Sequence, residues 1–232
     1  MTRTHPPAPD AAKRVLFPGG LYLILDPAVA GPRSLPDLVG MALAAKVRTF
    51  QLRMKTPETG AFYEMASALC PLVQGDGGIF IVNDRCDVAL AVGADGVHLG
   101  QEDLPLADAR AFLGREKRIG VSTHNLTQAL EAEAGGADYI GFGPIFPTTT
   151  KEKPDTVVGV AGLREVRARV RIPIVAIGGI TPRNAAEVMT AGADAVAVVS
   201  AVLAAPDPQA ALMELLKVVR LNPSPPEGRG LG

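Results

Sequence analysis

Short apolar runs alternate with polar segments along most of this chain. The runs hold four to six residues, mostly Val, Ile, Leu and Ala, without the in-out alternation of a half-exposed strand. Such runs are typical of parallel strands that are covered on both faces. The segments between them are rich in Ala, Leu, Glu and Arg, which favour helix. Strands are therefore predicted at residues 21–25, 48–53, 79–83, 96–99, 118–121, 139–142, 173–177 and 195–199.

Eight strands that alternate with helices predict an α/β fold, a single (β/α)8 TIM barrel. The length of 232 residues agrees with the ~250 residues usual for one such barrel. Gly-Ala-Asp recurs at 93–95, 136–138 and 192–194, each time after an Ala-rich stretch and before a strand. An open doubly wound sheet would show the same alternation. It would also carry a G-x-G-x-x-G turn after its first strand, and this chain has none there.

The two ends differ in composition from the region between them. The tail reads NPSPPEGRGLG and offers almost nothing to bury, and the first residues are also rich in proline. We expect a flexible N-terminal segment at residues 1–18, the barrel at 19–220 and a disordered tail at 221–232.

Charge and composition narrow the class of partner. The formal net charge is −1, so no overall field favours nucleic acid or an anionic membrane. No stretch has the length of an apolar membrane span or the core of a signal peptide, and we expect a cytoplasmic location. Cys70 and Cys86 lack the spacing of a zinc site and are predicted to be free thiols. The sequence leaves the oligomeric state open.

Polar motifs follow at least six of the predicted strands, and the carboxyl ends of barrel strands are where such folds build active sites. Gly178-Gly179 follows the seventh strand, and Val199-Ser200 follows the eighth. Backbone N–H groups at these two ends would form a phosphate cradle. A tight turn that needs glycine with no phosphate is the alternative. Thr181-Pro182 predicts a helix start, with Thr as cap and Pro as first residue.

Asp84 and Asp103 follow the third and fourth strands, which are neighbours in a barrel. Two carboxylates on adjacent strand ends offer the hard oxygen ligands that suit Mg2+. The alternative interpretation is structural: Asp103 caps the following helix, and Asp84 pairs with Arg85. The spacing alone leaves both interpretations open.

Three cations, Arg53, Lys55 and Lys151, follow the second and sixth strands. Together they indicate a highly charged anion such as a diphosphate, although a single loop lysine is usually solvated. The hydroxyls of residues 148–150 either donate to the same anion or stabilise a turn. His98 and His124 are acid–base candidates by residue type, or else fixed hydrogen-bonding groups.

Seven motifs together resemble the thiamine phosphate synthase family over residues 21–203. They are LYLILDP, QLRMK, IVNDRCDVALAVGADGVHLGQEDLP, GVSTH, GADYIGFGPIFPTTTK, IPIVAIGGIT and GADAVAVVS. The resemblance implies a (β/α)8 barrel that joins 4-amino-5-hydroxymethyl-2-methylpyrimidine diphosphate to hydroxyethylthiazole phosphate, giving thiamine phosphate and pyrophosphate. The family usually has a Gly where this chain has Lys46-Val47-Arg48, a departure that touches the end of a helix.

The resemblance also implies roles for individual residues. The pyrimidine diphosphate would be held by Gln51, Arg53, Lys55, Asn83, Ser122 and Lys151. Mg2+ would be ligated by Asp84 and Asp103. The thiazole phosphate would be received by Thr148, Thr149, Thr150, Gly179, Val199 and Ser200. The residues implied to be catalytic are Arg53, Lys151 and Ser122.

The implied reaction is dissociative and needs no protein nucleophile. Mg2+, Lys151 and Arg53 would neutralise the departing pyrophosphate, and the thiazole nitrogen would then be alkylated. A thiazole tautomerase of the same barrel family is the nearest alternative, but it would not need the full set of cations and carboxylates. A barrel that binds thiamine precursors without catalysis is the other alternative.

Overall fold

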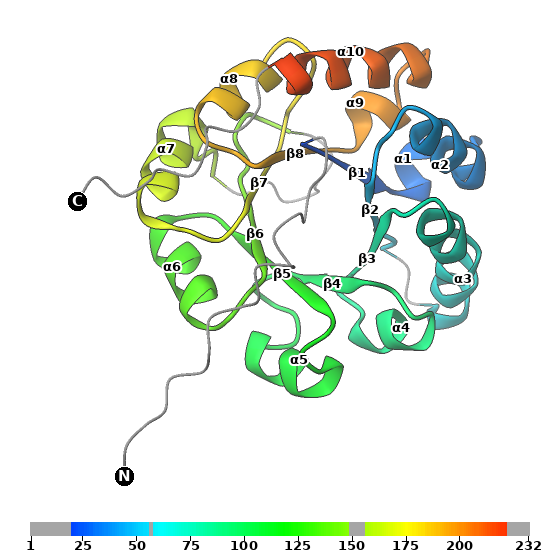
Figure 1. The fold of residues 1–232 in the computed structure, drawn as a ribbon, viewed down its shortest axis with the longest axis horizontal. Coiled ribbons are helices and arrows are strands. Elements are labelled where there is room, and N and C mark those ends of the chain that lie inside the picture. Colours follow the sequence, from blue (N-terminus) through cyan, green and yellow to red (C-terminus); the bar gives the residue numbers. More distant parts are fainter. Residues whose placement is uncertain (1–19, 56–57, 149–155, 222–232) are drawn as a thin grey trace.

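Eight parallel strands close into a barrel in sequence order, with β8 paired to β1 (Figure 1). The computed structural model describes residues 20–55, 58–148 and 156–221. Helices surround the strands on the outside, which confirms the predicted (β/α)8 barrel. Within those ranges no helix combines the length and the apolar character that crossing a membrane requires. The predicted N-terminal segment and tail lie outside the described residues, except for Leu221, which ends the last helix.

The strand bounds follow the apolar runs closely. The strands are β1 (Leu21–Leu25), β2 (Thr49–Leu52), β3 (Ile79–Asn83), β4 (Gly96–Leu99), β5 (Arg118–Thr123), β6 (Tyr139–Phe142), β7 (Ile174–Ile177) and β8 (Ala195–Val198). The largest difference is in β5, which extends through Ser122 and Thr123. These polar residues still pair with Gly141 and Phe142 of β6, so the strand continues after its apolar run ends.

The helices cover the barrel wall, and the last of them lies beside α8 and α9 (Figure 1). Their bounds are α1 (Pro27–Ala30), α2 (Leu35–Ala44), α3 (Thr59–Gly75), α4 (Cys86–Ala91), α5 (Leu106–Leu113), α6 (Leu126–Ala134), α7 (Gly159–Arg169), α8 (Ala185–Thr190), α9 (Ser200–Leu203) and α10 (Pro208–Leu221). One predicted helix start is wrong. The carbonyl of Thr181 accepts the N–H groups of Asn184 and Ala185, so a turn precedes α8, which begins at Ala185.

The repeated Gly-Ala-Asp steps are clamps at the amino ends of the strands. Asp95, Asp138 and Asp194 each precede a strand and accept a backbone N–H near the start of the strand before it. The acceptor–donor pairs are Asp95–Phe80, Asp138–Ile119 and Asp194–Ile174, at 2.8, 2.8 and 2.7 Å. Each carboxylate also accepts a hydrogen bond from a helix side chain. The donors are Gln74 of α3, Arg110 of α5 and Arg167 of α7.

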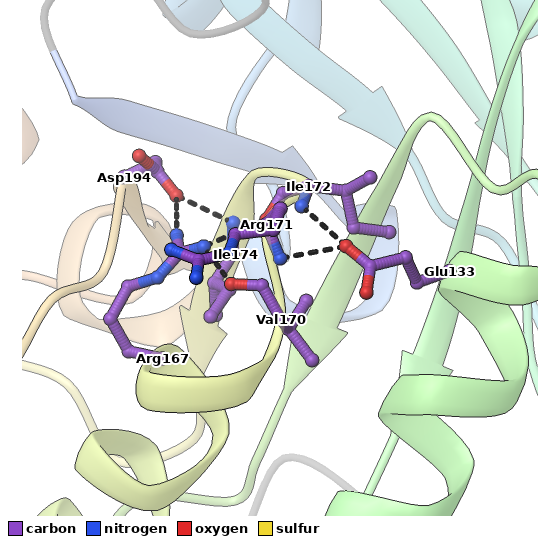
Figure 2. Close-up of polar contacts among 7 residues, drawn as sticks. All are labelled: Glu133, Arg167, Val170, Arg171, Ile172, Ile174 and Asp194. Atoms are coloured by element: carbon purple, nitrogen blue, oxygen red, sulfur yellow. Dashed lines mark hydrogen bonds and ion pairs between the residues drawn. The ribbon is translucent and has the colours of Figure 1, made fainter. Parts of the chain in front are cut away.

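Figure 2 shows the third clamp, where Arg167 and the N–H of Ile174 both meet the Asp194 carboxylate. Beside it, Glu133 of α6 accepts the N–H groups of Arg171 and Ile172 at 2.7 and 2.9 Å. These contacts tie helices to strands at the end of the barrel opposite the predicted site, the end that usually serves stability in this fold. The repeated Gly-Ala-Asp step in the sequence therefore has the same structural role at three strands.

Lys46 occupies a backbone position that favours glycine. Its φ is 70°, and it follows α2 in the left-handed position where helices commonly end with Gly. We expect Lys46→Gly to raise the free energy of unfolding by ~1 kcal/mol, because a side chain there strains the backbone. Chemical denaturation measures the change. Gly93 follows α4 with the same φ of 70° and open space for a Cβ, so Gly93→Lys should lower stability by a similar amount. A loss of stability in Lys46→Gly would contradict this interpretation.

Candidate active site

The described candidate residues lie at the carboxyl ends of the strands, on one rim of the barrel. Gln51 and Asn83 are buried in β2 and β3, with 3% and 8% of their surface exposed, while Lys55 and Ser200 are exposed. Thr149, Thr150 and Lys151 lie outside the described residues. The structure thus brings together the cations that follow β2, the carboxylates that follow β3 and β4, and Ser122 of β5.

Arg53 is held by a carboxylate that the sequence analysis did not single out. Its guanidinium forms an ion pair with Oδ2 of Asp26, the residue directly after β1, which is 3% exposed. The other oxygen of Asp26 accepts the N–H of Ala28 at 3.0 Å and so caps α1. Asp26 therefore fixes the direction of Arg53 at the rim. An Asp directly after a wholly apolar strand was the signal that could have revealed it.

Asp84 lies at the centre of a strained three-residue turn. Its φ is 62°, and the N–H of Arg85 bonds back to the carbonyl of Asn83 at 2.7 Å. Turns of this type are rare, and strained residues that persist in a fold are often functional. Oδ2 of Asp84 also pairs with Nζ of Lys55 at 2.8 Å, so the turn aims a carboxylate at a cation of the neighbouring strand.

Asp103 faces Asp84 across the ends of β3 and β4. Burial raises the pKa of Asp103, and a hydrogen bond to Asp84 together with its negative charge raises it further. Oδ2 of Asp103 also accepts the N–H of Gly100 at 2.7 Å. The structural alternatives for this pair are wrong: α5 begins at Leu106 after Pro105, and Arg85 pairs with Asp87.

The two carboxylates suit a divalent cation. Burial is the main cause of the raised pKa of Asp103, and the charge of Asp84 adds to it; a bound cation would offset that charge. Among the described residues no group of three or more His, Cys, Asp and Glu side chains forms a metal site. The remaining ligands of Mg2+ would then be water or substrate oxygens, as is usual for this ion.

Ser122 is bonded to a buried histidine. Nε2 of His98 lies 3.0 Å from Oγ of Ser122, and Nδ1 lies 3.1 Å from the hydroxyl of Tyr139. Gly120 leaves room for this arrangement, because a Cβ there would lie 2.1 Å from Cζ of Tyr139 and 2.6 Å from Nδ1 of His98. His98 is therefore a fixed hydrogen-bonding group. His124 is also held, with Nδ1 2.6 Å from the carbonyl of Gly143.

Burial of His98 predicts a dependence of stability on pH. It lowers the pKa of His98 from 6.5 to about 4, although the nearby charge of Asp103 acts in the opposite direction. Between these pH values the unfolded chain takes up a proton that the folded chain does not. The contribution of His98 to the free energy of unfolding should therefore fall by about 3 kcal/mol as the pH drops from about 6.5 to about 4. Denaturation at a series of pH values measures this. His98→Asn should lose this component and His124→Gln should keep it; an unchanged profile in His98→Asn would be the contrary result.

Gly178 and Gly179 have positive φ values of 99° and 62°. A Cβ on Gly178 would lie 2.5 Å from Cβ of Pro144, and one on Gly179 would lie 2.5 Å from the carbonyl oxygen of Pro147. Backbone conformation and close packing against the loop after β6 thus require both glycines. A phosphate cradle at Gly179, Val199 and Ser200 stays a prediction.

The model of the family described as thiamine monophosphate synthase matches residues 21–202. This chain belongs to the thiamine monophosphate synthase family. The match runs from the first residue of β1 into α9, so it covers every strand of the barrel. The family that the sequence motifs predicted is confirmed.

Two thiamine-phosphate synthases and one solved structure match this chain over most of its length. The thiamine-phosphate synthase of Chloroflexus aurantiacus is 50% identical over 202 residues, 87% of this chain and 93% of the relative. That of Moorella thermoacetica is 48% identical over 199 residues, 86% of this chain and 95% of the relative. The solved structure of thiamine phosphate pyrophosphorylase from Pyrococcus furiosus is 42% identical, with a TM-score of 0.79 over 87% of this chain and 95% of that one.

Proposed function

We propose that this member of the family is a thiamine-phosphate synthase, a transferase that joins the pyrimidine diphosphate to the thiazole phosphate and releases pyrophosphate. The observation that carries the proposal is one rim that combines a fixed cation, Arg53, with two facing carboxylates, Asp84 and Asp103. A diphosphate with a divalent cation is the ligand that such a rim would bind. A cytoplasmic location and the lack of a nucleic-acid partner stay predictions from composition.

The diphosphate substrate would lie between the cations that follow β2 and the carboxylates of Asp84 and Asp103. The Nη1 nitrogen of Arg53 donates to Asp26, which leaves other N–H groups of the guanidinium for phosphate oxygens. Lys55, Asn83 and Ser122 would donate to the same substrate, and Gln51 would contact it from inside the barrel. Lys151 has the same proposed role and lies outside the described residues.

Asp84 and Asp103 would hold Mg2+ at the rim. When bound, the ion would supply positive charge that stabilises the departing pyrophosphate. Lys55 is already paired with Asp84, so the two side chains are held next to each other before substrate binds. The strain at Asp84 supports a role that depends on its direction.

The reaction needs one bond broken and one formed. The bond between the pyrimidine methylene carbon and the diphosphate oxygen breaks, and its electron pair leaves with pyrophosphate. The thiazole nitrogen then donates its lone pair to the methylene carbon. Arg53, Lys55 and Ser122 would stabilise the charge that develops on the leaving group. Thr148, Thr149, Thr150, Gly179, Val199 and Ser200 would orient the thiazole by its phosphate.

Two reactions test the proposal against the tautomerase alternative. The protein is incubated with the thiazole phosphate alone, and with both substrates and Mg2+. We expect no change in the thiazole without the diphosphate, and product only when Mg2+ is present. Conversion of the thiazole phosphate to an isomer without the diphosphate would favour the tautomerase. Full activity in excess chelator would contradict the role of Asp84 and Asp103.

A further inference from the structure

A chain of hydrogen bonds crosses the inside of the barrel from β2 to β5. Nε2 of Gln51 donates to the hydroxyl of Tyr22 at 2.9 Å, and the hydroxyls of Tyr22 and Tyr139 lie 3.0 Å apart. Tyr139 is 3.1 Å from Nδ1 of His98, and Nε2 of His98 is 3.0 Å from Oγ of Ser122. Both ends of the chain, Gln51 and Ser122, are candidate substrate contacts.

This chain of hydrogen bonds lies in an otherwise apolar interior. Ile24, Ile81 and Val175 pack around the two tyrosines, whose surfaces are 1% and 0% exposed. Burial raises the pKa of both tyrosines, and it keeps His98 neutral at ordinary pH. Apolar residues of similar size are often as stable as a buried polar network, so stability alone does not account for the chain.

The links determine one another because each hydroxyl has one proton and a neutral imidazole has one N–H. If Ser122 donates its proton to an anionic substrate, its oxygen must accept from Nε2–H of His98. Nδ1 of His98 is then an acceptor, so Tyr139 donates to it. Tyr22 must then donate to Tyr139, and the amide of Gln51 must donate to Tyr22. The last step agrees with the observed orientation of the Gln51 amide.

We propose that Tyr22, Tyr139 and His98 are positioning residues that fix His98 as the Nε2–H tautomer and so keep the Ser122 proton directed at the diphosphate. The reverse direction would turn Ser122 toward His98 and present an oxygen lone pair to an anion. The inference rests on the proposed function only in that Ser122 contacts the diphosphate substrate.

The glycines of the neighbouring strands support a built arrangement. Gly120 lies beside both His98 and Tyr139 in the strand register, and Gly141 lies beside Ser122. A Cβ at Gly141 would come within 3.0 Å of Cε1 of His98. The rings of His98 and Tyr139 pack with their centroids 5.4 Å apart, so His98 is held by packing as well as by hydrogen bonds.

The first test is independent of activity. Protein labelled with 15N at histidine is examined by NMR without substrates, and His98 is assigned by loss of its signals in His98→Asn. We expect the Nε2–H tautomer, and we expect the Nδ1–H tautomer to become populated in Tyr139→Phe. The Nδ1–H tautomer in the unmodified protein would overturn the proposal, as would an unchanged tautomer in Tyr139→Phe.

The second test separates positioning from general packing. In Tyr139→Phe and Tyr22→Phe we expect KM for the pyrimidine diphosphate to rise about tenfold, with KM for the thiazole phosphate unchanged. Tyr63→Phe is the matched control, because Tyr63 lies exposed on α3, and its kinetics should not change. Equal rises in both KM values would indicate a general packing defect and overturn the proposal. If the unmodified protein forms no product, the proposed function fails. The NMR measurement of the His98 tautomer still tests the direction of the hydrogen bonds.

Discussion

Replacing Asp84 by Asn is expected to lower kcat/KM for thiamine phosphate formation by about 100- to 1,000-fold, while the barrel stays folded. Asn tolerates a positive φ nearly as well as Asp, so the strained turn at φ 62° should persist. What is lost is the charge that faces Asp103 and pairs with Lys55. Steady-state kinetics over a range of Mg2+ concentrations measure the effect, and thermal unfolding reports on the fold.

Asp87→Asn is the matched control for this experiment. Asp87 lies three positions further on, in the first turn of α4, and its carboxylate pairs with Arg85. The loss of that exposed pair should change stability by less than ~1 kcal/mol and leave activity within about twofold. Activity of Asp84→Asn close to that of Asp87→Asn would rule out a catalytic or metal-binding role for Asp84.

Arg53→Ala is expected to damage both activity and stability, for separate reasons. Activity should fall at least about 100-fold, because a cation fixed toward the leaving group is lost. The free energy of unfolding should fall by ~2 kcal/mol, since the buried carboxylate of Asp26 loses its ion pair. That figure is below the range for fully buried pairs because the Arg53 side chain is 22% exposed. Kinetics and chemical denaturation measure the two effects.

A second variant separates the two effects of Arg53. Asn at position 26 can still cap α1 by accepting the N–H of Ala28, and it carries no charge to leave unpaired. The double variant Asp26→Asn with Arg53→Ala should therefore recover most of the lost stability and none of the activity. Recovery of activity in the double variant would show that Arg53 acts only as a structural partner of Asp26.

The fold was predictable because its signals are local. Each strand contains an apolar run, and β1, β3, β4 and β6 begin and end where the sequence predicts. The end of β5 was not predictable in this way, because Ser122 and Thr123 join the strand through pairing with β6. The start of α8 was also missed, because the Asn184 side chain accepts the Thr181 N–H and closes a turn ahead of the helix.

The site was predictable in its residue types and less so in its contacts. Strand ends with charge identified Arg53, Asp84 and Asp103, and the resemblance identified the family. Asp26 follows an apolar run, which was a signal, but its role depends on Arg53, which follows the next strand, and no local pattern encodes that contact. The bonded chain through Tyr22 was hidden for a similar reason, since a tyrosine within an apolar run predicts strand and core alone.

The most direct measurement is an endpoint assay of the purified protein with the pyrimidine diphosphate, the thiazole phosphate and Mg2+. Thiamine phosphate and pyrophosphate are quantified in the same sample, with and without chelator. We expect the two products in equal amounts, neither of them in the presence of chelator, and both again when Mg2+ is restored. Binding of both substrates without either product would contradict the proposed synthase and leave a barrel that only binds thiamine precursors.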